Sequence, residues 1–325
     1  MGDGLGTMSK LQPLLIVIAA VIGVALGQSA PLAGALGGAM TPFLMVLLFL
    51  IFLKVDVQDI GKSFRNVRFT ATELAINFIW TPFFAVALGL LFLGGSLDMR
   101  IGFLMLLATP CTDWYLVFTA LTKGNVPLST AILPLNLVLQ VLLLPLYLFL
   151  MIGADSQFEM GPILMSMVYV LVIPFALANG AKIALRLLER SAAPLMEARG
   201  DDMQLLFLCL AVAAMFASQG GAIVDNPSLL LEMLPPLAVF FAANYALARA
   251  VGRAMGFPWR DTVSLSFTTL ARNSPLALAI AVAAFPGSSL IALVLVVGPL
   301  IELPVLALAS RALLHAGASR PEPPS

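Results

Sequence analysis

The chain has 325 residues, of which 61% are hydrophobic and 10% charged, and its mean hydropathy is +1.03. Soluble domains carry about 25% charged residues, so this composition excludes a soluble globular protein and indicates an integral membrane protein. Seventeen basic residues balance seventeen acidic ones, so no nucleic-acid partner is indicated. Two cysteines are too few for a disulfide framework or a metal cluster, and we expect neither a metal nor a cofactor.

Ten apolar segments are candidates for membrane-spanning helices, which need about 20 residues each. They are residues 11–28, 34–53, 72–95, 101–121, 128–152, 161–187, 203–222, 229–250, 261–285 and 288–310. The connections between them are short and leave no room for a soluble domain. The sequence therefore predicts an all-α integral membrane protein with ten transmembrane helices, in contact with the lipid bilayer.

The distribution of basic residues predicts the orientation. An even number of spans places both termini on one side of the membrane. Apart from Arg100 and Arg272, every lysine and arginine falls on that side. The positive-inside rule then places both termini in the cytoplasm and the chain in the inner (plasma) membrane.

Five segments precede the loop near residue 155 and five follow it, which predicts two repeats, residues 1–155 and 156–325. Because each repeat has an odd number of spans, the second must be inverted relative to the first, and segment four corresponds to segment nine. Segment four contains Thr109-Pro110-Cys111-Thr112-Asp113, and segment nine contains Ala271-Arg272-Asn273-Ser274-Pro275. Proline lacks the amide hydrogen that a helix interior requires, so both helices should break there. A matched pair of broken helices predicts the midplane binding site of a transporter.

Two ionisable residues, Asp113 and Arg272, lie at these breaks. Each costs roughly 2.5–3.5 kcal/mol at a helix centre, so the two side chains should face each other. The pair is either a structural lock between the helices or a working site. In a working site, Arg272 would hold an anionic substrate or replace a bound cation, and Asp113 would take up and release a proton.

Cys111 is either a soft ligand for a thiophilic solute or a small buried apolar residue. Asn136 and Gln140 lie one turn apart on one face of segment five, and Asn77 lies in segment three. These amides either bridge helices or converge on the breaks. Glu302 is a proton carrier or a partner for a basic residue. The predicted substrate-binding residues are Asn77, Cys111, Thr112, Asp113, Asn136, Gln140, Arg272, Asn273 and Ser274, and the predicted proton-coupling residues are Asp113 and Glu302.

Several motifs resemble those of a known superfamily of transporters. Thr122-Lys123-Gly124-Asn125-Val126-Pro127-Leu128-Ser129 resembles a loop of the bile acid:sodium symporters. Asn77-Phe78-Ile79-Trp80-Thr81-Pro82 resembles a motif shared with the related bacterial arsenite efflux permeases. Thr109-Pro110-Cys111, Leu135-Asn136 and Gly298-Pro299-Leu300-Ile301-Glu302-Leu303-Pro304 are more similar to the arsenite permeases. The resemblance implies inverted five-span repeats, a panel and a core domain, and crossing helices four and nine at the site.

The chain also departs from both branches. Alignment with the sodium symporters puts Thr268 and Arg272 where those proteins bind sodium, and an arginine there would repel that ion. Arsenite permeases have a glutamate where this chain has Pro275, but they share a functionally important cysteine that matches Cys111.

The sequence therefore predicts a secondary active transporter, working by alternating access, for a small anionic or metalloid solute. Arsenite-type efflux with proton coupling is the first hypothesis. Sodium-coupled symport of an organic anion, such as a bile-acid-like compound, is the alternative. An enzyme is not expected, because the only histidine, His315, lies in the C-terminal tail. A passive channel is a third possible function, and saturable flux against a gradient would distinguish a carrier from it.

Overall fold

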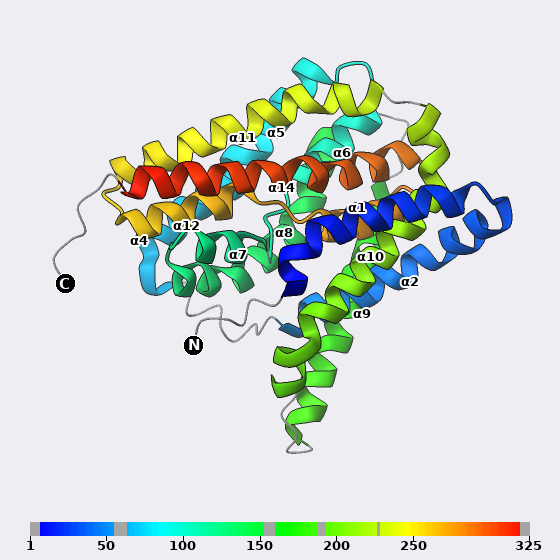
Figure 1. Ribbon diagram of the computed structural model, residues 1–325, viewed down its shortest axis with the longest axis horizontal. Helices are drawn as coiled ribbons and strands as arrows, with labels where there is room; N and C mark the ends of the chain where they lie inside the picture. The colour runs from blue at the N-terminus through cyan, green and yellow to red at the C-terminus, as the bar shows by residue number, and fades with distance from the viewer. Residues whose placement is uncertain are drawn as a thin grey trace. The chain divides into compact units, whose positions relative to one another are not determined.

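The structure is a computed structural model that describes residues 7–54, 64–112, 114–152, 160–187, 193–225 and 228–318. Within these ranges the chain is helical apart from turns and one isolated β-bridge (Figure 1). The α-helices are α1 Thr7–Gly27, α2 Ala30–Lys54, α4 Val67–Ala75, α5 Thr81–Phe92, α6 Leu97–Leu107, α7 Trp114–Leu121, α8 Val126–Ile152, α9 Met160–Leu187, α10 Ala193–Asp225, α11 Ser228–Ala254, α12 Trp259–Leu270, α13 Ser274–Ala284 and α14 Ser289–Ala318. A 3₁₀-helix, η2 (Phe64–Asn66), precedes α4, and a π-helix, η3 (Ile76–Trp80), joins α4 to α5.

Among the described residues, each of the ten apolar segments is mostly helical. Five helical stretches are long and apolar enough to cross a membrane: Ala30–Leu53, Phe64–Phe92, Val126–Met151, Leu231–Ala254 and Ser289–Gly317. Ten spans and inverted repeats stay predictions.

The predicted breaks in segments four and nine are present. Segment four divides into α6 and α7, and segment nine divides into α12 and α13.

The third segment begins earlier than the sequence predicts. The helical stretch starts with η2 at Phe64 rather than near residue 72, and α4 follows at Val67. The Asn66 side chain accepts a hydrogen bond from the Phe69 amide and so caps the first turn of α4. Farther along, η3 inserts a π-helical turn at Asn77. Turns of this kind are rare and occur frequently at functional sites.

The chain divides into two compact units that do not follow its halves. The first unit comprises residues 1–56, 155–229 and 275–296, and the second comprises residues 57–154, 230–274 and 297–325. In the first unit, α1 and α2 pack on α10, and α2 also packs on α9. A methyl group at Gly23 or Gly27 would collide with the backbone of Ala213 or Ala217, so this contact requires small residues at four-residue spacing.

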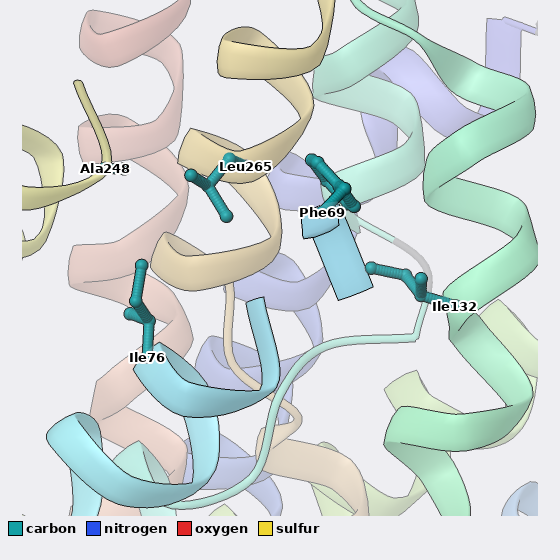
Figure 2. Close-up of a cluster of buried hydrophobic side chains, with 5 residues drawn as sticks. All are labelled: Phe69, Ile76, Ile132, Ala248 and Leu265. Carbon is teal, nitrogen blue, oxygen red and sulfur yellow. The ribbon is translucent and has the colours of Figure 1, made fainter. Parts of the chain in front are cut away.

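The second unit contains both breaks. One apolar cluster of this unit joins four helices and the π-helix, through Phe69, Ile76, Ile132, Ala248 and Leu265 (Figure 2). The cluster holds the first half of the third segment against α8 and α12.

The Lys123-Gly124-Asn125 loop ties the start of α8 to α12. Lys123 adopts a positive φ of 59°, and a Cβ at Gly124 would lie 2.9 Å from the Val263 side chain. Asn125 donates to Asp261 Oδ1 at 2.7 Å and accepts from the Leu128 amide at 3.2 Å. The glycine therefore permits close approach, and the asparagine caps α8.

Candidate functional site

The two helix breaks meet in the second unit and pair through their backbones. The Cys111 amide donates to the Ala271 carbonyl at 3.0 Å, and the Asn273 amide donates to the Thr109 carbonyl at 2.7 Å. Together these bonds form an antiparallel bridge between Pro110 and Arg272. The predicted meeting of segments four and nine is therefore present in the structure.

Side chains from neighbouring helices satisfy the last carbonyls of α12. The Asn77 amide donates to the Thr268 carbonyl at 3.1 Å, and the Asn244 amide donates to the Thr269 carbonyl at 3.3 Å. The carbonyls of a terminal turn lack intrahelical partners, and leaving them bare inside a membrane protein would be costly.

At the end of α6, a neighbouring residue of the same segment binds the last carbonyls. The Thr109 hydroxyl donates to the carbonyls of Met105 and Leu106, at 2.9 and 3.2 Å. The break therefore keeps its polar backbone paired while it leaves helical geometry.

Arg272 joins the ends of both broken helices. Its guanidinium donates to the Leu107 carbonyl at 2.9 Å, to the Leu270 carbonyl at 3.2 Å and to the Thr269 carbonyl. It also donates to Asn77 Oδ1 at 3.0 Å. Four of its five N–H groups thus bind the protein, and the side chain is 2% exposed. A positive charge at the ends of α6 and α12 is also favoured by the helix dipoles.

Two further side chains, those of Phe240 and Glu302, contact Arg272. The guanidinium lies 5.4 Å from the ring centroid of Phe240, within cation–π range. The backbone amide of Arg272 donates to Glu302 Oε1 at 2.9 Å, and Glu302 is buried. The predicted intramembrane acid Glu302 therefore lies directly at the break in segment nine.

A second acid, Glu73, completes a polar network on the other side of Asn77. Glu73 Oε1 accepts from the Asn77 amide at 2.5 Å and from the Asn136 amide at 2.7 Å. Asn77 thus receives a hydrogen bond from Arg272 on its oxygen and gives one to Glu73 from its nitrogen. Of the three amides predicted to converge on the breaks, Asn77 contacts them directly, and Asn136 is joined to Asn77 through Glu73.

Cys111 lies between the bridge and the first turn of α7. Its Sγ accepts from the Trp114 amide at 3.2 Å, and the residue is 6% exposed. The thiol is therefore buried where the backbone is not helical, at the amino end of a helix. Cys209, in contrast, is half-buried within α10.

The remaining predicted residues lie at or near the same place. Thr112, Asn273 and Ser274 are buried at the two breaks, and Gln140 is fully buried on α8, one turn beyond Asn136. Asp113 lies outside the described residues, so its predicted pairing with Arg272 stays a prediction.

Sequence reasoning missed Glu73 and Asn244. Segment three was expected to begin near residue 72, which put Glu73 at the membrane edge, where an acid is unremarkable. Its spacing of four residues from Asn77 was the available signal, since residues i and i+4 share a helix face. Asn244 lies within an apolar run, where it accepts from Trp80 Nε1 at 2.9 Å.

A model of the Sodium Bile acid symporter family matches residues 41–226, which is more than half of the chain. The chain belongs to this family. It is therefore a multi-pass membrane transporter that lies in a lipid bilayer and moves small solutes, and it is not an enzyme.

Curated relatives match the chain over most of its length. It is 26% identical to the arsenical-resistance protein Acr3 of Corynebacterium glutamicum, over 92% of this chain and 86% of the relative. It is 22% identical to the arsenical-resistance protein Acr3 of Alkaliphilus metalliredigens, over 94% and 92%. It is also 28% identical to the uncharacterized protein YbaS of Bacillus subtilis, over 89% and 92%.

Proposed function

We propose that this transporter exports an arsenite-type solute across the plasma membrane in exchange for protons, by alternating access. The observation that carries the proposal is the position of Cys111, buried beside the paired helix breaks. Sulfur ligands suit soft, thiophilic solutes, and few other side chains do. The names of the two Acr3 relatives support the same class of solute.

If the thiol binds the solute, Cys111→Ser is expected to abolish arsenite resistance in a host that lacks its own arsenite exporter. Serine keeps the size and a hydrogen-bond acceptor for the Trp114 amide but removes the soft sulfur. The matched control is Cys209→Ser in α10, which should leave resistance intact. Membrane levels of both variants are measured by immunoblot. Equal tolerance of the two changes at equal levels would give Cys111 a packing role only.

Proton coupling is favoured over sodium coupling by the charge at the crossing. Arg272 is a buried, permanently charged guanidinium held by the carbonyls at the ends of α6 and α12. A second full positive charge beside it would be repelled in this low-dielectric setting. Glu302, in contact with the Arg272 backbone, is an acid that a proton can neutralise.

In proteoliposomes, an imposed pH gradient is therefore expected to accumulate arsenite on the more acidic side. Replacing sodium by potassium or choline should leave the rate unchanged. The rate is measured as arsenic retained on filters, and protein-free liposomes are the control. A steep sodium dependence would favour instead the alternative, sodium-coupled symport of an organic anion.

A further inference from the structure

In the polar network of Glu73, Asn136 and Gln140, three buried oxygens and one buried nitrogen have no hydrogen-bond partner that the structure describes. Within the described part of the chain, Glu73 Oε2, Asn136 Oδ1 and both amide atoms of Gln140 are buried and have no hydrogen-bond partner. All three side chains are at most 1% exposed. Buried polar atoms of this kind are rare, and each costs about 1–3 kcal/mol when unpaired. Three side chains with this property close together indicate that something else binds there.

The fold brings these groups to one place. Asn136 contacts Glu73 directly, at 2.7 Å. The Tyr147 hydroxyl donates to the Phe78 carbonyl at 2.6 Å, so α8 and the third segment run in the same direction. Gln140 is one turn beyond Asn136 on the same face of α8, between these two contacts. Gln140 therefore lies on the face of α8 that contacts the third segment.

We propose that Glu73 is a proton-binding residue of the transport cycle, with the proton carried on Oε2 and hydrogen-bonded to the amide oxygen of Asn136 or Gln140. Binding forms one O–H bond on the carboxylate, and release returns the proton to water on the other side of the membrane. This inference rests on the proposed exchange of solute for protons and names the group that carries the proton.

The protonated form of Glu73 pairs two of the unpaired oxygens with each other. A carboxylate only accepts hydrogen bonds, whereas a carboxylic acid adds one donor. That donor pairs Oε2 with an otherwise unpaired amide oxygen, while Oε1 keeps its bonds from Asn77 and Asn136. A metal cation would require more oxygen ligands than Glu73 Oε2, Asn136 Oδ1 and Gln140 Oε1 supply.

The charged neighbours of Glu73 are few among the residues that the structure describes. Across Asn77 lies Arg272, whose backbone contacts Glu302 of α14. On α12 the acid Asp261 lies at the opposite end, bonded to Asn125. α8 carries one titratable group, the Tyr147 hydroxyl, which donates to the Phe78 carbonyl. Arg272 thus carries one positive charge between two carboxylates, Glu73 and Glu302, and one added proton makes this group neutral.

The first test needs no transported solute. Infrared difference spectra of the purified full-length protein between roughly pH 6 and pH 9, a range in which carboxyl groups of ordinary pKa stay ionised, should contain a carboxylic-acid carbonyl band. We expect Glu73→Gln to remove a component of that band and Glu232→Gln, an exposed acid on α11, to leave it whole. An unchanged band in Glu73→Gln overturns the proposal, whether or not the protein carries arsenite.

The second test measures coupling in proteoliposomes. A gradient of about one pH unit is worth about 1.4 kcal/mol per proton and supports about a tenfold arsenite gradient in one-for-one exchange. Glu73→Gln, which resembles the protonated form, should accumulate no arsenite, although labelled arsenite still exchanges across the membrane. Gln140→Leu should shift the pH at which accumulation is half-maximal.

These tests distinguish a failure of the inference about Glu73 from a failure of the proposed function. A wild-type protein that moves no arsenite refutes the proposed function, while the infrared result still decides the role of Glu73. A Glu73→Gln variant that accumulates arsenite like wild type overturns the inference and leaves the proposed function standing. Loss of a sodium-dependent rate in Glu73→Gln, with no loss of proton drive, would assign the site to sodium and also overturn it.

Discussion

Arg272→Gln is expected to lower the free energy of unfolding by roughly 3–5 kcal/mol, the range found when one partner of a buried charged network is removed. The guanidinium binds the carbonyls of Leu107, Thr269 and Leu270, so its loss removes this donor from all three and leaves Thr269 with the Asn244 amide. Asn77 also loses the donor to its oxygen. Folded yield and thermal unfolding in detergent, followed by size-exclusion chromatography, measure the effect.

Two further variants serve as controls for Arg272→Gln. Arg253→Gln, at the exposed end of α11, removes the same charge without a buried network and should leave folded yield unchanged. Arg272→Lys keeps the charge but loses the planar fork of donors, so it should fall between wild type and Arg272→Gln. A yield for Arg272→Gln equal to that of Arg253→Gln would show that the crossing does not depend on this side chain.

The sequence predicts those parts of the structure that have local causes. Pro110 ends α6 because proline cannot continue the helical hydrogen-bond ladder, and the matching break after Leu270 is marked by Arg272 in an apolar segment. Helical segments follow from apolar length alone. That the two breaks meet follows from the cost of an isolated charge in a membrane.

Other features of the structure depend on contacts between residues that are distant in the chain. Glu73 becomes a core residue only because the helix extends back to Phe64 and Asn136 approaches from α8. Asn244 reaches the end of α12 from the interior of an apolar run. The two compact units likewise interleave segments from both halves, since packing follows space rather than chain order.

The role of Arg272 also has a cause that sequence alone does not reveal. Its position at a break predicted either a lock or a working site. The structure supplies backbone carbonyls as its main partners, which no pattern of side chains predicts. Arg272 therefore contacts the ends of both broken helices at once, Glu302 accepts from its backbone amide, and Glu73 lies one contact beyond it, across Asn77.

Neutralising a nearby carboxylate is expected to recover part of the stability lost in Arg272→Gln. Once the guanidinium is gone, each buried carboxylate lacks its compensating charge, so removing that charge relieves the cost. A double-mutant cycle of Arg272→Gln with Glu302→Gln should give a coupling of about 0.5–3 kcal/mol, because residues in one network do not contribute additively. A cycle with Asp113→Asn should give a coupling in the same range if the predicted pairing of Asp113 with Arg272 holds. Thermal unfolding of the single and double variants gives the four free energies of each cycle.

The cycle with Asp113 also decides between a lock and a working pair. If the two charges only join segments four and nine, transport by the double variant should recover together with folded yield. If the pair takes part in the transport cycle, the double variant should fold and yet move no arsenite. Additive losses in both yield and transport would mean that Asp113 and Arg272 do not interact, and Glu302, whose Oε1 accepts from the Arg272 amide at 2.9 Å, would be left as the acid directly at the break.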